Sequence, residues 1–193
     1  MTPTPPTVPA TPTGGRKEAM ARTRESIIDA GLRLAERTGL AGLSVNLIVE
    51  EAGVAKGTFF HHFGDRASYL LALHREFHDR LATQLQPAIA GVPPGRRRLT
   101  IGAKTYLDGC LRDRGVRALL LEARAEPAVT DEIKHRNKAG AELFQPDFAA
   151  LKRPHPYESA QLWVGMLAEA ALIEHQAAKA LPDIREALER FLN

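Results

Sequence analysis

The segment Lys56-Gly-Thr-Phe-Phe-His-His-Phe63 gathers residue types that bind nucleic acid on a stretch short enough for a two-turn helix. Lysine binds phosphate, and threonine and histidine can hydrogen-bond to the edges of base pairs. At helical spacing Phe59 and Phe63 lie on one side of this segment. The other side carries Lys56, Thr58, His61 and His62. The pattern predicts a helix that packs through its phenylalanines and turns its polar side outward.

A second candidate for chemistry is the pair His74 and His78, which stand four residues apart on one helical face. Two imidazoles at this spacing can share a metal ion. The residues between them, Arg75-Glu-Phe77, do not make the His-Glu-x-x-His motif of zinc proteases, and no carboxylate cluster completes a ligand set. We therefore predict no metal, no cofactor and no catalytic residue. A metal sensor or metal-dependent enzyme built on these histidines is the alternative.

The elements around the polar segment carry the signals of a helix-turn-helix motif at residues 44–63. Ser44 offers an N-cap oxygen to a short helix over residues 45–52, and Gly53 ends that helix. The apolar side expected to brace the next helix consists of Leu47, Ile48 and Ala52. Two short helices joined by a tight glycine turn can place the second one in the major groove of DNA.

Helical patterns also flank this motif. One runs from Arg22 to Gly39, and Asp65 caps a longer one with Leu70, Leu73, Phe77 and Leu81 on one face. Residues 1–15 contain five prolines and no charged side chain, so we predict a disordered tail. Four cations follow the tail, either as an arm that reaches DNA or as the solvated start of a helix: Arg16, Lys17, Arg22 and Arg24.

Residues 23–71 resemble the N-terminal domain of the tetracycline-repressor (TetR) family. The matching core is Ala52-Gly-Val-Ala-Lys-Gly-Thr-Phe-Phe-His-His-Phe63, followed by Gly64-Asp-Arg-Ala-Ser-Tyr-Leu70. The family pattern is Ala-Gly-Val-Ser-Lys-Gly-x-aliphatic-Tyr-x-His-Phe, and Ser44-Val-Asn-Leu-Ile48 matches its entry to the preceding helix. The resemblance implies a helix-turn-helix domain of three helices over residues 16–85. It also implies a helical domain over residues 86–193 that dimerises and binds an effector.

The resemblance implies two groups of DNA contacts. Helix starts favour anions, because free N–H groups and the helix dipole meet there. The residues implied to meet phosphates are Ser44, Asn46, Lys56 and Gly57, joined by Arg66 from the following helix. Thr58 and His61 are implied to contact base edges, and His62 to support the helix or a phosphate.

Three positions depart from the family pattern. Phe60 stands where the family has a tyrosine, so the phosphate-bonding hydroxyl is missing, although we still count the residue in the interface. Ala55 replaces the serine that caps the second helix, and Val49 replaces a smaller alanine. A plain three-helix bundle without a ligand is the alternative, but it does not account for the polar side of residues 56–63.

The remaining residues also read as helices. No segment alternates as a strand would, so we predict an all-α chain of about nine helices. The helix predicted over residues 157–180 is apolar on more than one side, and it should bury one of them against a second copy of the chain. With a last helix over residues 184–192 it predicts a two-fold homodimer interface. The residues assigned to this interface are Trp163, Leu167, Ala171, Ala178, Leu188 and Phe191.

Polar and aromatic residues on otherwise apolar helices predict a cavity for a small-molecule effector. These residues are Tyr106, Cys110, Glu122, His135, Trp163 and His175. Each taken singly is explained at least as well by ordinary core or surface packing. A structural dimer without an effector is therefore the alternative for this half of the chain.

Composition limits the class of protein. The net charge is +3, and residues 16–80 hold ten Lys and Arg against nine Asp and Glu, so the arrangement of charges must create any DNA-binding surface. No apolar run approaches the ~20 residues that cross a bilayer, and no secretory signal is visible. We predict a cytoplasmic, ligand-responsive transcriptional repressor. It binds a partly palindromic double-stranded DNA operator as a homodimer and contacts no membrane.

Overall fold

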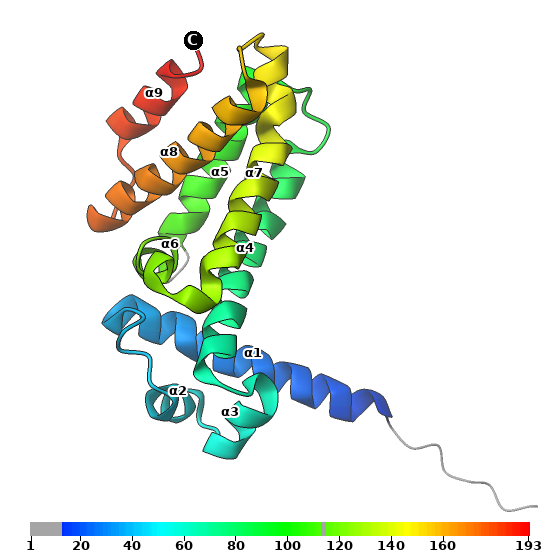
Figure 1. Cartoon of the computed structure of the whole chain (residues 1–193), viewed down its shortest axis with the longest axis vertical. Coiled ribbons are helices and arrows are strands. Elements are labelled where there is room, and N and C mark those ends of the chain that lie inside the picture. The colour runs from blue at the N-terminus through cyan, green and yellow to red at the C-terminus, as the bar shows by residue number, and fades with distance from the viewer. Residues whose placement is uncertain (1–12, 113–114) are drawn as a thin grey trace, which may run out of the picture.

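The computed structural model describes residues 13–112 and 115–193, and within them it is a two-part, all-helical protein (Figure 1). The described residues contain nine α-helices, two short 3-10 helices and no strand. In chain order the helices are α1 (Thr13–Thr38), α2 (Val45–Ala52), α3 (Lys56–Phe63), α4 (Arg66–Ile89), α5 (Arg96–Arg112), α6 (Val116–Leu120), η1 (Glu122–Ala125), η2 (Pro127–Val129), α7 (Thr130–Ala150), α8 (Pro156–Gln176) and α9 (Pro182–Arg190). The predicted all-α class is confirmed.

The first three helices form the helix-turn-helix domain, and their ends follow the predicted capping residues. The Ser44 side chain accepts a hydrogen bond from the Leu47 amide at 3.2 Å and caps α2. Gly53 ends α2 in the left-handed conformation, at φ +65°, which costs glycine less than any other residue. Ile48 is buried as predicted, whereas Leu47 faces solvent.

Three aromatic rings hold α3 against the start of α4. The centroid of Phe59 lies 5.4 Å from that of Phe63 and 5.0 Å from that of Tyr69. The Tyr69 hydroxyl donates to the Ile27 carbonyl of α1 at 2.9 Å. Gly31 allows this approach, because a β-carbon there would lie 1.8 Å from the hydroxyl. The aromatic cluster therefore fixes the position of α3 relative to α1 and α4.

Helix α1 is longer than the sequence predicts. It begins at Thr13 and not near Arg22, so residues 13–15 of the expected tail are helical, while residues 1–12 lie outside the described part. Apolar periodicity begins only at Ile27, because residues 15–22 of the helix are exposed. Its Arg, Lys, Glu and Ala residues favour helix without burial. Figure 1 shows this half projecting beyond the body of the molecule.

Two helices each run through a proline, a residue that breaks or kinks most helix interiors. Helix α4 continues through Pro87 to Ile89, and α7 continues through Pro146 to Ala150. Both prolines lie close to the C-terminal end of their helix, where only a short stretch follows the missing N–H. Helix α4 consequently joins the helix-turn-helix domain to the C-terminal helices as one continuous rod (Figure 1).

The C-terminal part packs α5, α7 and α8 with α4, and α9 covers one side of α8 (Figure 1). Residues 116–125 divide into α6 and η1. Arg185 fixes α9 to its neighbours, donating to the buried Glu174 of α8 at 2.7 Å and to Asp108 of α5 at 2.6 Å. These ion pairs hold α8 and α9 as one unit.

Candidate DNA-binding surface and ligand cavity

Helix α3 has the two-sided character predicted from its sequence. Phe59 and Phe63 are buried, with exposed fractions of 0% and 8%. Lys56, Gly57 and His61 are exposed, and Phe60 is 43% exposed beside them. The inner side chains thus anchor the helix, while its start and outer face meet solvent with one lysine and no acidic group.

Gly57 is exposed at the first turn of α3, and packing within the chain does not require a glycine there. A β-carbon built on it would meet no atom within 4 Å, and its backbone does not adopt a positive φ. Gly57 therefore leaves the helix backbone accessible to a large partner from outside. A DNA phosphate is a partner of this kind, because backbone N–H groups at a helix start bind anions.

The other predicted contact residues lie around this helix start. Ser44 and Asn46 are exposed at the start of α2, although the Ser44 hydroxyl is already used as the cap. Thr58 and His62 are half-buried. Burial, His61 and Arg24 together lower the pKa of His62, which favours the neutral form of this imidazole at neutral pH.

Arg66 was expected to meet a phosphate, but in the structure its guanidinium is hydrogen-bonded within the chain. Its Nε donates to the Leu43 carbonyl and its Nη2 to the Leu40 carbonyl, both at 2.8 Å, and its Nη1 lies 4.0 Å from Glu126. The Leu40 carbonyl also accepts from the Leu43 amide at 3.1 Å, so the guanidinium adds to the hydrogen bonds of the α1–α2 turn. Arg66 therefore ties this turn to α4 and to the segment after η1, with 38% of its side chain still exposed.

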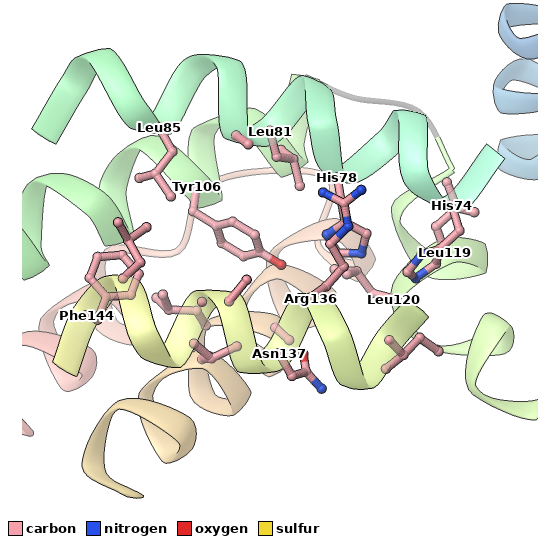
Figure 2. Close-up of a pocket in the computed structure, with 18 of the residues that line it drawn as sticks. His74, His78, Leu81, Leu85, Tyr106, Leu119, Leu120, Arg136, Asn137 and Phe144 are labelled. Carbon is pink, nitrogen blue, oxygen red and sulfur yellow. The ribbon is translucent and has the colours of Figure 1, made fainter. Parts of the chain in front are cut away.

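A cavity of about 330 Å³ lies in the C-terminal part between α4, α5, α7 and α8 (Figure 2). One region of its wall is apolar and includes Leu85 and Phe144. Figure 2 shows the Tyr106 ring crossing the middle, with its hydroxyl directed toward His78 and Arg136. The volume falls at the lower end of the range of about 300–1,000 Å³ for small-molecule sites.

The histidine pair lies on the wall of this cavity. The ring centroids of His74 and His78 are 4.5 Å apart. Burial lowers the pKa of His74 to about 4, with Arg136 acting in the same direction and Glu132 against it. Burial, His74 and Arg136 lower the pKa of His78 to about 3. Both rings are therefore neutral at neutral pH. Among the described residues no third His, Cys, Asp or Glu joins them in a metal-binding group.

Of the six residues predicted to line a cavity, only Tyr106 does so. Cys110 is buried beside it, and Glu122 accepts a hydrogen bond from the Leu40 amide at 2.8 Å. His135 faces solvent, Trp163 fills the core and borders a smaller cavity of about 140 Å³, and His175 is half-buried elsewhere on α8. These side chains stood out because they are polar or aromatic, but the crossing of the helices decides which ones face inward.

Helices α4 and α7 contribute many of the cavity residues that the sequence analysis missed. Ile133, Arg136, Gly140 and Phe144 recur at helical spacing and line one side of the site. This stripe could have been recognised by its period. Arg124 of η1 could not, because it enters the wall through a 3-10 turn that the sequence does not signal.

The predicted dimer residues also require correction. Trp163, Leu167, Ala171 and Leu188 are at most 6% exposed within a single chain, so they pack against their own domain. Ala178 and Phe191 are exposed, and the large apolar side chain exposed on α8 is Leu162, at 71%. Helix α8 is apolar on two sides as predicted, but the residues assigned to its outer side belong to its inner side.

The N-terminal part of the chain is similar in sequence to known transcriptional regulators. The profile of the bacterial regulatory proteins of the tetR family matches residues 27–73. The transcriptional regulator AcuR of Cereibacter sphaeroides is 34% identical over 91 residues, 46% of this chain and 42% of AcuR. The transcriptional repressor AcnR of Corynebacterium glutamicum is 37% identical over 60 residues, 31% of this chain and 32% of AcnR. Each match thus spans less than half of the relative.

Most of the chain has the same fold as solved structures of other proteins. A TetR-family transcriptional regulator from Rhodococcus sp. superimposes with a TM-score of 0.75 at 21% identity, covering 89% of this chain and 98% of that one. The multidrug binding protein EbrR, complexed with imidazole, gives 0.68 at 24% identity, covering 89% and 90%. Among the described residues no helix has the length and apolar character to span a membrane. Residues 27–73 therefore match the tetR family of bacterial regulatory proteins in sequence, and the chain as a whole shares its all-helical fold with a solved TetR-family regulator.

Proposed function

We propose that this protein is a transcriptional repressor that binds double-stranded DNA through α3 and releases it when a small molecule occupies the cavity. The observation that carries the proposal is α3 itself. Buried phenylalanines hold this helix, and its exposed start presents Lys56 and an unencumbered Gly57. A helix braced in this way can enter the major groove while its first turn meets a phosphate.

Roles within the interface follow from exposure. Lys56 and the backbone at Gly57 bind phosphate and set the position of the helix. These phosphate contacts do not distinguish one DNA sequence from another. His61 and Thr58 contact base edges, where an imidazole nitrogen and a hydroxyl can read a donor or acceptor pattern. Asn46 binds a second phosphate from the start of α2. Phe60 adds apolar contact where a tyrosine would add a hydrogen bond.

Two copies of the chain bind one operator. Pairing through the outer sides of α8 and α9 joins two chains by a two-fold axis and places their α3 helices in successive major grooves, about 34–36 Å apart. A ligand that favours a different orientation of α4 changes this distance and lowers the affinity for DNA. The cavity beside α4 and the exposed Leu162 and Phe191 support this arrangement.

The test is binding of the full-length protein to the DNA upstream of its own gene, measured by fluorescence anisotropy at several salt concentrations. Lys56→Ala should weaken binding and reduce the slope of log K against log salt by about one, because one phosphate contact is lost. Thr58→Ala should weaken binding of the specific site more than that of unrelated DNA. The control Lys134→Ala removes an exposed lysine of α7 and should bind as wild type does.

Binding that is unchanged by both α3 substitutions would refute the proposal. If Lys134→Ala weakens DNA binding as much as Lys56→Ala does, the proposal is also refuted, since the loss would then come from net charge and not from a specific contact. Circular dichroism and thermal melting of each variant establish that the fold is retained.

A further inference from the structure

The cavity wall is chemically divided. Leucine, isoleucine, valine, phenylalanine and alanine side chains form most of it, and the polar groups are His74, His78, Gln86, Tyr106, Arg124, Arg136 and Asn137. In Figure 2 the hydroxyl of Tyr106 turns away from Leu85 and Phe144 and toward His78 and Arg136. A ligand that matches this wall has an apolar body and one polar end.

The charges of the wall have one sign. Two arginines line the cavity, and no aspartate or glutamate is among the lining residues. Arg136 is balanced from outside the cavity, because it donates to Glu132 at 2.7 Å and to Asp79 at 2.6 Å. The side chain of Arg124 has no hydrogen-bond or ion-pair partner among the described residues. Arg124 is itself exposed to solvent at the edge of the cavity, so it is a charge without a protein counter-ion that an entering ligand can reach, and it disfavours a cation and favours an anion.

Hydrogen-bond donors accompany this charge. Burial, assisted by Cys110, raises the pKa of Tyr106 well above its usual range, so its hydroxyl keeps its proton, and Arg124 is close enough to act against this shift. His74 is 1% exposed, and its Nδ1 has no hydrogen-bond partner in the described part of the chain. A buried polar atom without a partner is costly, and a ligand can supply the partner. A buried carboxylate in turn requires donors of this kind.

We propose that the cavity binds a monocarboxylate with an apolar body, that Arg124 and the Tyr106 hydroxyl hold the carboxylate, and that η1 transmits this binding to the helix-turn-helix domain. This inference deepens the proposed function, on which its regulatory part rests. The apolar body lies toward Leu85 and Phe144. Arg124, which is exposed at the edge of the cavity, meets the carboxylate there.

The transmission follows from the position of Arg124 within η1. Two residues before it, Glu122 accepts a hydrogen bond from the Leu40 amide at 2.8 Å, and two residues after it, Glu126 lies 4.0 Å from Arg66. Both contacts reach the α1–α2 turn, because Arg66 also donates to the carbonyls of Leu40 and Leu43. A carboxylate that draws Arg124 inward pulls on the segment that holds this turn.

Ligand class is tested by isothermal titration calorimetry of the full-length protein with three probes that share one chain length. Decanoate, decanamide and decyltrimethylammonium differ in head-group charge and are used below micelle-forming concentrations. We expect decanoate to bind, the amide to bind at least about tenfold more weakly, and the cation not to bind. Absence of decanoate binding, or amide or cation binding that equals it, would overturn the assignment.

Arg124→Gln separates the proposed contact from a general apolar effect. It should weaken decanoate binding by about tenfold or more and leave decanamide binding nearly unchanged, because only the charged hydrogen bonds are lost. The control Arg97→Gln removes an exposed arginine of α5 and should not change either affinity. Equal loss for acid and amide in Arg124→Gln would assign the arginine a merely structural role.

Transmission is tested by DNA binding with and without decanoate. Glu122→Gln should keep the decanoate affinity of the wild type but lose most of the effect of decanoate on DNA binding, whereas Glu142→Gln, an exposed α7 control, should keep that effect. Transmission through η1 would be refuted if decanoate changed the DNA affinity of Glu122→Gln as much as that of wild type. It would also be refuted if decanoate did not change the DNA affinity of wild type. The calorimetry needs no DNA, so a protein that fails to bind DNA would refute the proposed function and leave the ligand assignment to be judged separately.

Discussion

At the scale of single residues, Gly57 offers a substitution in which stability and DNA binding should move in opposite directions. The site has room for a β-carbon and no positive φ, so Gly57→Ala should stabilise α3 by about 0.5–1 kcal/mol through lower backbone entropy. The added methyl stands where we place a phosphate. Urea denaturation should therefore show a more stable protein, and anisotropy should show weaker DNA binding.

If Gly57→Ala is more stable and binds DNA as tightly as wild type, no phosphate contacts the turn at Gly57. Urea denaturation of Gly165→Ala, a glycine of α8 that also has open space around it, provides the matched control for the gain in stability alone. It should be stabilised by a similar amount, because the same backbone entropy is removed.

The buried histidines of the cavity predict how stability depends on pH. The pKa values of His74 and His78 fall from 6.5 to about 4 and about 3 on folding, because burial penalises the charged ring. Between these values and 6.5 the unfolded chain binds more protons than the folded one, so stability falls as the pH drops below 6.5. From pH 7 to pH 5 the loss should be roughly 2 kcal/mol for each histidine.

Urea denaturation at the two pH values measures this loss. His78→Gln should remove a large part of the pH dependence, whereas His135→Gln, on the exposed side of α7, should retain it. A pH dependence that is the same in both variants would show that the cavity histidines do not titrate as the structure requires.

At the scale of elements, the starts of three successive helices differ in their caps. Asp65 accepts a hydrogen bond from the Ser68 amide at 2.7 Å, and Ser44 caps α2, but Ala55 gives α3 no side-chain cap. The backbone of Ala55 is extended, at φ −70° and ψ 147°, as an N-cap requires. Ala55→Ser should therefore raise the free energy of unfolding by about 1 kcal/mol.

The converse substitution provides the comparison. Ser44→Ala should lower the free energy of unfolding by about 1 kcal/mol, because the Leu47 amide then loses its partner. Chemical denaturation of the two variants and wild type measures both changes. A stabilising effect of Ser44→Ala, or none from Ala55→Ser, would show that packing and not capping determines the stability of these helix starts.

At the scale of the whole molecule, the outer sides of α8 and α9 distinguish a monomer from a dimer. Leu162 is 71% exposed and Phe191 is 63% exposed in a single chain, more than any other large apolar side chain among the described residues. Leu162→Glu and Phe191→Glu should each shift the protein toward monomer in sedimentation equilibrium, because an unpaired carboxylate in an apolar interface is costly. DNA affinity should fall with the dimer.

Met20→Glu is the control for a general loss of hydrophobicity, since Met20 is 40% exposed on the projecting half of α1. It should leave the dimer intact. Dimers that persist in both Leu162→Glu and Phe191→Glu would place the interface elsewhere on the molecule.

The sequence predicted best where the cause of structure is local. Ser44 and Asp65 cap helices, Gly53 ends one, and the spacing of Phe59 and Phe63 divides α3 into an inner and an outer side, because caps, turns and helical periods act within a few residues. The family resemblance of residues 23–71 depends on the same local run. The start of α1 was missed since residues 15–22 are exposed, and apolar periodicity cannot mark an exposed helix.

Tertiary structure alone decided which side of each later helix faces the cavity, the core or solvent. Trp163 and Leu162 are neighbours in the sequence, yet one is buried and the other is the most exposed large apolar residue described. The surroundings of Arg66 and Arg124 are likewise determined by segments that are distant in the sequence. The physical reason is that a helix with two apolar sides has no intrinsic preference between them. Packing against α4, α5 and α7 makes that choice, and no local signal in the sequence records it.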